Sequence, residues 1–542
     1  MPDDANFAAT LSARARAHPG ATALIESGAR RTITFGALES LAGRYAHGLA
    51  RWGVRSGDRA LYLLRPSIDS YAVFYALLRL GAVPVLMDPR MGLRRLLTCI
   101  AVVRPRVVLA VPLVHAVRVF ARQPFAAAQV LITAGRRWFW GGVRLSECLA
   151  EDGTLGNPPT APADASFLPF TSGSTGAAKA VFYDHAMLRQ QVAVMHDVCD
   201  WREGMRVVMA YAPFVPYALA DGLAAILPDI DFSRPAAANP ARIVEAVRQY
   251  AAQCAFASPI VWIRLARYCE RNGIALPTLE RAVTAGAPVP ADLHRRLLPV
   301  LHRDGQLYTP YGATEAMPLT TTCTSELVDT WEETRRGGGT CVGTPLACVE
   351  IRIIRVTDDP IPVWADDLCV PEGAIGEIVV GGPLVSPAYP DRPDETARAK
   401  IRRGPHVLHR MGDLGRRDAT GRLWFCGRKS DRIETRHGLL PSGPLESIFD
   451  QHPAVFRSAV VGMGPIHART VVACVELDAG ETFTPRLEAE LSALTTGTCY
   501  EGVVTRFFPH RGFPVDTRHN SKIRRDELAG WAAARLSRRA RS

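Results

Sequence analysis

Apolar positions along the chain follow two different spacings. Segments with apolar residues three or four positions apart predict helices, most clearly at Leu38–Trp52, Pro240–Ala251 and Ile260–Asn272. Short β-branched runs between such segments predict strands, for example at Val107–Val111, Val207–Ala210 and Ala282–Thr284. Because helix and strand patterns alternate, the sequence predicts an α/β fold in which parallel sheets are covered by helices.

The pattern changes beyond about residue 340. Strand-like segments follow one another at Val349–Val356, Ala374–Val380 and Arg422–Cys426. After Arg428 the chain predicts a helix near Pro444–Phe449, strands at Ser458–Val461 and Val471–Glu476, and a helix near Thr484–Leu494. We therefore expect a large N-terminal domain, residues 1–427, with a β-rich subdomain from about 340. A small α+β domain, residues 428–542, should follow it.

The strongly apolar stretch Tyr71–Met87 predicts a buried helix that runs into a strand. Arg79, Gly81 and Pro84 interrupt it before it reaches the ~20 residues of a membrane-spanning helix. The first residues are acidic, unlike those of a secretory signal. The twelve cysteines have no spacing typical of a zinc site or a disulfide framework. These features predict free thiols and a cytoplasmic location.

Composition and charge narrow the function classes. The chain has 542 residues, 48% hydrophobic and 22% charged, which is typical of a large globular protein and excludes a small module. Its formal net charge is +11, but no nucleic-acid recognition fold is visible, so we expect no nucleic-acid partner. A basic cluster near the C-terminus, Arg535, Arg538, Arg539 and Arg541, could dock on a membrane surface or on an enzyme of the same pathway. A solvated chain end is the alternative.

Lysine is scarce, since 60 of the 64 basic residues are arginine. The four lysines, at positions 179, 400, 429 and 522, are therefore the first places to look for chemistry. Lys179 ends a run of small residues, Thr171, Ser172, Gly173, Ser174, Thr175 and Gly176. Their hydroxyls and unobstructed backbone N–H groups can wrap a polyphosphate, although the spacing is not that of a P-loop. An ordinary flexible loop is the alternative.

This run resembles the signature of the adenylate-forming superfamily, which comprises acyl-CoA synthetases, luciferases and peptide-synthetase adenylation domains. Further segments resemble other motifs of that superfamily in the same order: residues 80–89, Gly286-Ala287-Pro288, Tyr311-Gly312-Ala313-Thr314-Glu315, residues 376–383, Gly412-Asp413, Gly427-Arg428 and residues 520–523. The resemblance extends over residues ~30 to 530. An ordered set is far more specific than any one of these motifs.

The resemblance implies a role for each matched residue. It implies that ATP and Mg²⁺ are bound, with Glu315 holding the metal and Thr314 beside it on phosphate. Lys522 would bridge the substrate carboxylate and the α-phosphate, and Lys179 would contact phosphate. Asp413 would bind the ribose hydroxyls beside Arg428, and Tyr311 would stack on adenine next to Gly312. Taken singly, such residues are more often surface or salt-bridged groups.

In the acyl-CoA synthetases the small C-terminal domain rotates about a hinge after the first step, so the resemblance implies that residues 428–542 are mobile. Segments around the expected hinge depart from the CoA ligases. Ser430 stands where Asp is usual, Glu434 where Lys or Asn is usual, and His437 where a glycine is expected. Longer strings resemble the β-lactone synthetases of bacterial long-chain olefin biosynthesis: residues 309–315, 340–343, 409–413, 421–429 and 513–520. The resemblance implies adenylation of a hydrophobic 2-alkyl-3-hydroxy acid, whose own hydroxyl then closes a β-lactone.

Two alternatives remain open at this point. One is a fatty acyl-CoA ligase or a fatty acyl-AMP ligase, which passes the acyl group to CoA or to a carrier protein. The other is a degenerate member that binds without turnover, which the set of matched residues disfavours. Tyr211–Tyr217, followed by Ala218–Pro228, falls where the superfamily places its acyl pocket, but ordinary core packing would give the same composition.

Overall fold

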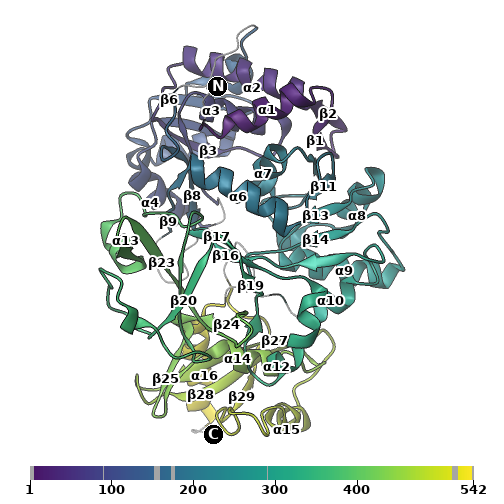
Figure 1. Ribbon diagram of the computed structural model, residues 1–542, viewed down its shortest axis with the longest axis vertical. Helices are drawn as coiled ribbons and strands as arrows, with labels where there is room; N and C mark the ends of the chain where they lie inside the picture. Colours follow the sequence, from purple (N-terminus) through teal and green to yellow (C-terminus); the bar gives the residue numbers. More distant parts are fainter. Residues whose placement is uncertain are drawn as a thin grey trace. The chain divides into compact units, whose positions relative to one another are not determined.

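The computed structural model describes residues 5–88, 91–151, 159–171, 178–287, 289, 291–515 and 523–539. The chain forms two compact units (Figure 1). The first contains Met1–Tyr308, Gly312–Pro318 and Pro383–Thr396, and the second contains Thr309–Tyr311, Leu319–Gly382 and Ala397–Ser542. The expected domain boundary after Gly427 lies inside the second unit and stays a prediction.

Two sheets form the centre of the first unit. One has seven strands in the order β15-β14-β13-β11-β12-β1-β2, all parallel except β2. Its strands are β1 (Thr22–Glu26), β2 (Arg31–Thr34), β11 (Arg206–Met209), β12 (Ala224–Leu227), β13 (Cys254–Phe256), β14 (Arg281–Val283) and β15 (Gln306–Tyr308). The strands predicted at 207 and 282 are β11 and β14 of this sheet, and the strand predicted at 107 is β5 (Val107–Ala110) of the other sheet. The α/β class is therefore confirmed.

The other sheet of this unit has eight strands, in the order β10-β8-β4-β3-β5-β6-β7 with β9 paired to β8. The strands from β8 to β7 are parallel. They are β3 (Arg59–Leu63), β4 (Val83–Leu86), β5 (Val107–Ala110), β6 (Val130–Thr133), β7 (Val143–Arg144), β8 (Ala165–Thr171), β9 (Lys179–Ala180) and β10 (Tyr183–Asp184).

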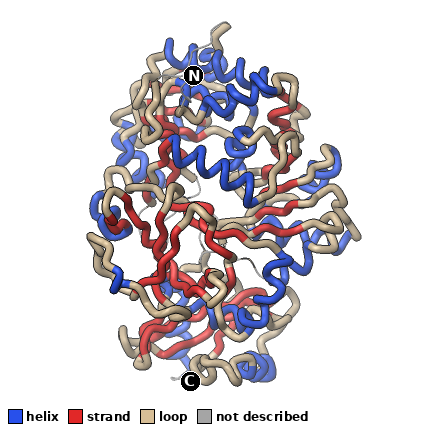
Figure 2. The backbone as a smooth tube through the Cα atoms, in the orientation of Figure 1, coloured by secondary structure: helices blue, strands red, loops and turns tan. Residues whose placement is uncertain are grey.

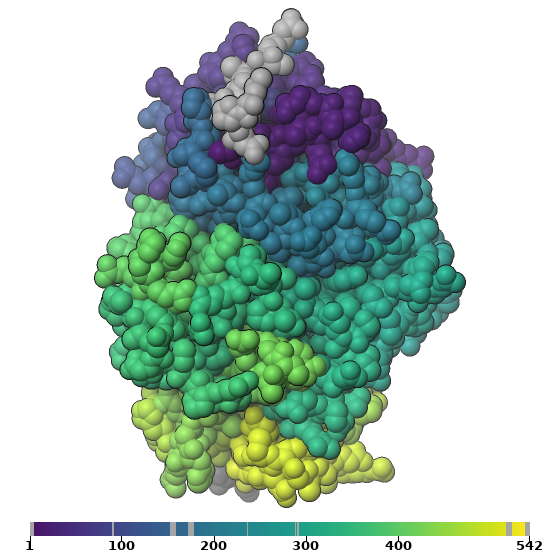
Figure 3. Space-filling view, viewed as in Figure 1, coloured from purple at the N-terminus to yellow at the C-terminus, as the bar shows by residue number. Residues whose placement is uncertain are grey.

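Helices cover these sheets, as Figure 2 shows in blue around the red strands. They are α1 (Ala8–Ala17), α2 (Phe35–Arg51), α3 (Ile68–Arg79), α4 (Leu93–Val103), α5 (Pro112–Phe120), α6 (His185–Val198), α7 (Val215–Ala220), α8 (Pro240–Gln249), α9 (Pro259–Asn272) and α10 (Ala291–Leu297). The three helices predicted from periodicity correspond to α2, α8 and α9. Helix α1 lies at the surface of the unit, where Figure 3 shows it in dark purple.

Local sequence explains where these helices begin and end. The side chains of Ser67 and Ser70 form a reciprocal capping box at the start of α3. That helix leads through a left-handed Gly81 into β4, so the expected buried helix followed by a strand is confirmed. Helix α9 begins at Pro259 and ends at Gly273, whose φ of 60° suits glycine at a C-cap.

The second unit is dominated by antiparallel strands. Its largest sheet has the order β18-β24-β23-β21-β20 with β22 on β23. The strands are β18 (Thr340–Cys341), β20 (Glu350–Ile354), β21 (Gly376–Gly381), β22 (Lys400–Arg403), β23 (His406–Arg417) and β24 (Leu423–Arg428). The strands predicted after residue 340 match β20, β21 and β24. Shorter elements of this unit are β19 (Thr344–Pro345), α11 (Thr324–Leu327) and α12 (Trp331–Arg335).

The last part of the second unit mixes helices and strands, as the sequence predicts. Its elements are β25 (Ile433–Thr435), β26 (Gly438–Leu440), α14 (Ser442–Phe449), β27 (Val455–Met463), β28 (Thr470–Leu477), α15 (Pro485–Ala493), β29 (Phe507–Pro509) and α16 (Arg525–Arg539). Helix α16 buries Leu528 and Ala532, and the Trp531 ring lies 4.5 Å from His510. Three elements contain residues of both units: β16 (Tyr311–Ala313), β17 (Ala316–Thr321) and α13 (Pro393–Ala399).

Two further expectations concern the cysteines and membrane-spanning helices. All twelve cysteines are free, as the sequence predicts. Among the described residues, no helix is long and apolar enough to cross a membrane.

Candidate active site

The loop predicted to bind phosphate is closed at its base by a strand pair. Thr171 ends β8 and Lys179 begins β9, and the two residues stand opposite each other in the antiparallel ladder. The intervening residues Ser172, Gly173, Ser174, Thr175 and Gly176 lie outside the described part of the chain. The pairing fixes where the loop leaves the sheet and returns to it, so it also fixes the origin of the Lys179 side chain.

Tyr389 joins two of the predicted site residues within the first unit. Its hydroxyl donates to Oε1 of Glu315 at 2.8 Å, and the Lys179 ammonium lies 4.9 Å from the centre of its ring. The backbone carbonyl of Glu315 also accepts from the Ser386 N–H at 2.9 Å. Burial, then the Glu315 charge, raise the pKa of Tyr389 well above its usual range, so the hydroxyl stays a donor.

The segment that carries Glu315 starts at the carboxyl end of a parallel strand. It follows β15, which pairs with β14, and Gly286 and Ala287 follow β14. In open α/β sheets, ligands bind outside the carboxyl ends of the strands. Two motifs distant in sequence therefore start at one sheet edge. Pro288, the third residue of the Gly286-Ala287-Pro288 motif, lies outside the described residues.

Close packing explains two further residues of this segment. A Cβ atom on Gly312 would lie 2.8 Å from the carbonyl oxygen of Ala316, so no side chain fits there. The carbonyl of Thr314 accepts from the buried Tyr183 hydroxyl at 2.6 Å. Thr314 is thus held through its backbone, which leaves the placement of its hydroxyl independent of that bond.

Asp413 is the centre of a second group, in the second unit. Asp413 on β23 stands opposite Arg428 on β24, and an Arg428 guanidinium nitrogen lies 2.7 Å from Oδ1 of Asp413. The Tyr311 hydroxyl donates to Oδ2 of the same carboxylate at 2.7 Å. Asp413 is 3% exposed, and the Phe425 ring lies 6.2 Å from that of Tyr311. The structure therefore brings Tyr311, Asp413 and Arg428 together.

The segment after Arg428 is held by ion pairs. The Lys429 ammonium lies 3.2 Å from Oε2 of Glu377 and 2.9 Å from the carbonyl oxygen of Thr357. Arg410 contacts the same Glu377 oxygen at 2.6 Å, and both of these side chains are almost fully buried. Lys429 thus has a structural role just before the expected hinge at Ser430.

Lys522 lies outside the described residues. Three positions later, Arg525 begins α16 and binds both carboxylate oxygens of Glu446, at 2.6 and 2.7 Å. A third contact, 3.1 Å long, joins Arg525 to Asp431, next to Ser430. The chain that leaves the lysine motif is therefore fixed to the segment that follows Arg428.

The expected acyl region divides into two parts. Ala218–Ala220 of α7 and all of β12 are buried in the core, so core packing explains that half. The rings of Tyr211 and Phe214 are partly exposed and stack on Phe256, with ring centres 6.1 and 4.6 Å apart. An apolar surface suited to a hydrocarbon chain is therefore limited to these aromatic rings.

No group of three or more His, Cys, Asp or Glu side chains in the described ranges is arranged to hold a metal ion. A magnesium ion commonly binds one or two carboxylates and completes its shell with substrate phosphates and water. Glu315 fits that pattern, because Tyr389 fixes its Oε1 and no residue in the described ranges forms a hydrogen bond or an ion pair with its other carboxylate oxygen.

Sequence reasoning missed Tyr389. The family-like motif at residues 376–383 ends six positions before it, and the segment Ser386-Pro-Ala-Tyr-Pro-Asp-Arg-Pro393 has only the composition of a turn. Its signal was a single aromatic residue among prolines. Its place beside the Thr-Glu motif is seen only in the structure, in the bridge from Ala316 to Val385 and in the two hydrogen bonds to Glu315.

The sequence matches a family model and several characterised proteins. A family model described as AMP-binding enzyme matches residues 11–390. The sequence is 38% identical to the olefin β-lactone synthetase of Stenotrophomonas maltophilia strain K279a over 99% of both chains. Identity is also 38% to that of Xanthomonas campestris pv. campestris, over 97% of both. Feruloyl-CoA synthase of an Amycolatopsis species is 29% identical over 83% of this chain and 84% of its own.

Solved structures show the same fold. The anthranilate CoA ligase AuaEII bound to anthranoyl-AMP superposes with a TM-score of 0.82 at 18% identity, covering 98% of this chain and 99% of that one. The amide bond synthetase McbA from Marinactinospora thermotolerans gives a TM-score of 0.80 at 23% identity, over 97% and 99%.

Proposed function

The chain belongs to the AMP-binding enzyme family and to its olefin β-lactone synthetases, and from that premise we propose that it converts a 2-alkyl-3-hydroxy acid to a β-lactone at the expense of ATP. The observation that carries the proposal is the 38% identity over the whole chain to two olefin β-lactone synthetases. Two groups of side-chain contacts support the proposal. Lys179 and Glu315 both contact Tyr389, and Tyr311 and Arg428 both contact Asp413.

The first step joins two anions, so cations must offset their repulsion. A carboxylate oxygen of the acid attacks the α-phosphorus of ATP, and pyrophosphate leaves as the new P–O bond forms. Lys522 bridges the two anions, while Lys179 and the loop residues from Thr171 to Gly176 bind phosphate. Glu315 is the proposed ligand for Mg²⁺, which neutralises phosphate charge when it is bound.

The nucleoside is positioned by the second group. Asp413 accepts from the ribose hydroxyls, and Arg428 supplies a cation beside the buried carboxylate. The Tyr311 ring stacks on adenine, and its hydroxyl, held by Asp413, limits the rotation of that ring. Gly286, Ala287 and Pro288 form the adenine-side loop, and Gly312 keeps the following strand close.

The second step needs no external nucleophile. The 3-hydroxyl oxygen attacks the acyl carbon of the adenylate, AMP leaves, and the hydroxyl proton is released. A tethered nucleophile has a high effective concentration, which offsets part of the strain of a four-membered ring. The departures at Ser430, Glu434 and His437 agree with an enzyme that does not guide a thiol to the adenylate. The acyl chain is assigned to Tyr211 and Phe214.

Product analysis tests the proposal. The protein, ATP, Mg²⁺ and a synthetic 2-alkyl-3-hydroxy acid should give a β-lactone by NMR at the same rate with and without CoA. Lys522→Ala should abolish pyrophosphate release, whereas Arg524→Ala, which removes an exposed cation paired with Glu527, should not. Formation of acyl-CoA only when CoA is added would replace this function by that of an acyl-CoA ligase.

The basic C-terminus is a separate part of the proposal. Arg535 and Arg538 belong to α16, and we assign this end of the chain to docking on a pathway enzyme or a membrane surface. Removal of residues 532–542 would also delete Ala532 from the core, so the test replaces Arg535, Arg538, Arg539 and Arg541 with Gln. Unchanged co-sedimentation with pathway enzymes and vesicles would reject this assignment.

A further inference from the structure

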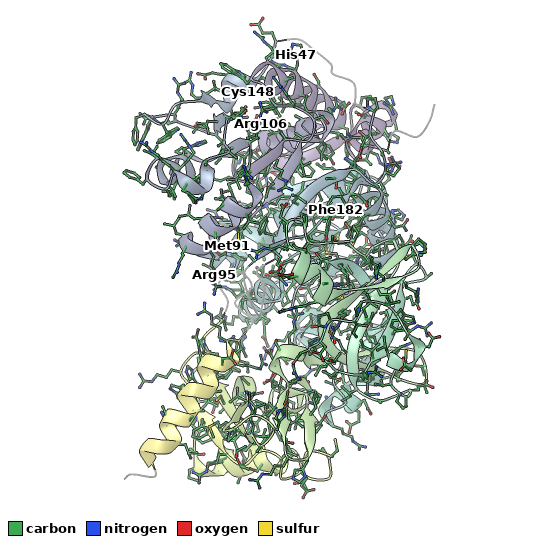
Figure 4. All side chains as sticks on the ribbon, turned by 90° about the vertical axis from the view of Figure 1, so that its left-hand side faces the viewer. His47, Met91, Arg95, Arg106, Cys148 and Phe182 are labelled. Carbon is green, nitrogen blue, oxygen red and sulfur yellow. The ribbon has the colours of Figure 1, made fainter. Side chains whose placement is uncertain are left out.

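The net charge of the chain is concentrated in one segment. Residues 89–146 contain ten arginines and no aspartate or glutamate. The rest of the chain has 54 basic and 53 acidic side chains, which nearly cancel. This segment contains α4, β5, α5 and β6 of the first unit. Figure 4 shows Met91 and Arg95 at the beginning of α4 and Arg106 just before β5.

Four large apolar side chains of this segment are exposed. Helix α5 presents Leu113 and Phe120, which are 73% and 86% exposed and lie seven residues apart, on the same side of the helix. The loop between β6 and β7 presents Trp138 and Phe139, 62% and 70% exposed. We call these four residues, three of which are aromatic, the aromatic face. Exposed apolar residues that gather in one region mark an interaction site.

The loop of the aromatic face is fixed beside α5. Trp140 is buried, stacks on His115 of α5 with ring centres 6.1 Å apart, and accepts at its backbone carbonyl from Arg118 at 2.6 Å. Gly141 and Gly142 have φ near +78° and +75°, which glycine adopts without strain. Trp138 and Phe139 therefore project from an ordered support.

Arginines flank this face without acidic partners. Arg122, Arg136 and Arg137 are exposed, and none of them forms an ion pair with any residue that the structure describes. Arg106 and Arg144 are different, because Asp58 and Glu147 pair with them. Burial keeps the pKa of His115 below its usual range, so that ring packs as a neutral group. Among the described residues, the charge beside the aromatic face is therefore mainly positive, although the Glu147 carboxylate lies close enough to Arg137 to interact with it electrostatically.

We propose that the aromatic face and Arg122, Arg136 and Arg137 dock on the surface of an anionic phospholipid bilayer. Tryptophan and phenylalanine side chains insert at the level of the headgroups, and arginines bind the lipid phosphates. One apolar anchor or one basic cluster gives only weak binding, whereas the two together give stable attachment. A protein partner of this face would need acidic groups around an apolar pocket, whereas an anionic bilayer supplies both features over a wide area.

This docking surface is independent of the proposed chemistry, since it rests on exposure and charge alone. If the substrate is a long-chain hydroxy acid, docking places the enzyme where such an acid dissolves. The β-lactone assay and the vesicle assay therefore have separate outcomes.

Vesicle flotation with the full chain tests the proposal. Vesicles of phosphatidylcholine with about one third phosphatidylglycerol should carry the protein, and vesicles of phosphatidylcholine alone should not. Trp138→Ser with Phe139→Ser, and separately Arg136→Gln with Arg137→Gln, should each lower the partition coefficient about tenfold. Raised salt should weaken the binding of the wild type.

Matched controls come from the second unit. Val363→Ser with Ile466→Ser removes two exposed apolar side chains, 56% and 61% exposed, and should leave vesicle binding unchanged. Pyrophosphate release with a short, water-soluble hydroxy acid should be the same in all variants, which confirms that they fold.

Two results of the vesicle assay would overturn the proposal, and a third would come from the oligomeric state. One is a wild type that stays unbound on anionic vesicles. The other is equal binding by the wild type and the Trp138→Ser, Phe139→Ser variant. A concentration-dependent dimer that is lost in this variant, without vesicle binding, would assign the face to a second copy of the chain and likewise overturn the lipid proposal.

Discussion

The hydroxyl of Tyr389 donates to Oε1 of Glu315 at 2.8 Å, while the face of the same ring lies 4.9 Å from the ammonium of Lys179. One side chain therefore contacts both the proposed metal ligand and the lysine of the phosphate loop. Its two contacts are chemically different, so substitutions can separate them.

Tyr389→Phe removes only the hydrogen bond to Glu315. A hydrogen bond to a charged group contributes about 1.5–3 kcal/mol, so we expect the Mg²⁺ concentration for half-maximal pyrophosphate release to rise about tenfold. The KM for ATP should change less, because the ring under Lys179 stays. Tyr389→Leu should raise both. Tyr250→Phe, at a tyrosine packed against the core of the first sheet, is the matched control. An unchanged Mg²⁺ requirement in Tyr389→Phe would remove this residue from the site.

Tyr311→Phe separates stacking from orientation at the proposed adenine site. The ring at position 311 remains available for stacking, but the 2.7 Å hydrogen bond to Asp413 is lost. We expect weaker ATP binding by a few fold in calorimetry, and a larger loss for Tyr311→Leu, which removes the stacking surface. Equal affinities for both variants would show that the ring does not contact the base.

Glu377 neutralises two cations in the second unit, Arg410 and Lys429. Glu377→Gln leaves the Arg410 guanidinium buried without its counter-ion, and breaking such a pair costs about 3–5 kcal/mol. We expect a clearly lower midpoint of thermal unfolding. Lys429→Met should have a smaller effect, because that ammonium is less buried than Arg410. A Glu377→Gln variant as stable as the wild type would contradict this account.

His294 should make the protein sensitive to acid. Burial lowers the pKa of His294 to about 4, and the side chain is 1% exposed. Between pH 6.5 and 4 the unfolded chain binds a proton at this residue that the folded chain does not, so the free energy of unfolding decreases as the pH falls through this range. The loss should reach about 3 kcal/mol near pH 4.

His294→Gln removes that titration. Chemical unfolding at pH 7 and at pH 4.5 should give a smaller difference for the variant than for the wild type. His302→Gln, at a partly exposed histidine, is the control and should keep the pH dependence of the wild type. Identical pH profiles for the wild type and His294→Gln would show that other groups account for the loss.

Periodicity predicted the core elements well because their burial is local information. α2, α8 and α9 start within three residues of the predicted positions and end within two, because capping residues such as Gly273 can be recognised in the sequence. The candidate site residues Lys179, Glu315, Asp413 and Arg428 could be named from the sequence because their motifs are short and continuous, and their roles stay predictions. Contacts between distant segments were not predictable. Neither Tyr389 beside Glu315 nor Glu377 beside Lys429 has a signal in the spacing of residues.

The distribution of charge along the chain is a second feature that was not predicted, because the net charge of the whole chain conceals it. The net charge of +11 indicated nothing specific, although the acid-free segment 89–146 could have been seen in the sequence. The interpretation of this segment as a docking surface required the exposed fractions of Trp138 and Phe139, because buried aromatic residues would not indicate such a surface. Aromatic residues in a loop have no periodicity that reveals which side faces solvent.

Asp413 and Arg428 are direct partners across the β23–β24 hairpin, and this limits how the family can vary in length. A shift of the pairing by one residue would turn one of the two side chains to the opposite face of the sheet. Insertions in the turn between Arg417 and Leu423 leave the pairing intact, whereas an insertion within either strand shifts it unless a bulge absorbs the extra residue, as happens at Cys426 between Phe425 and Gly427. Evolutionary length changes in this hairpin should therefore be confined to its turn and to such bulges.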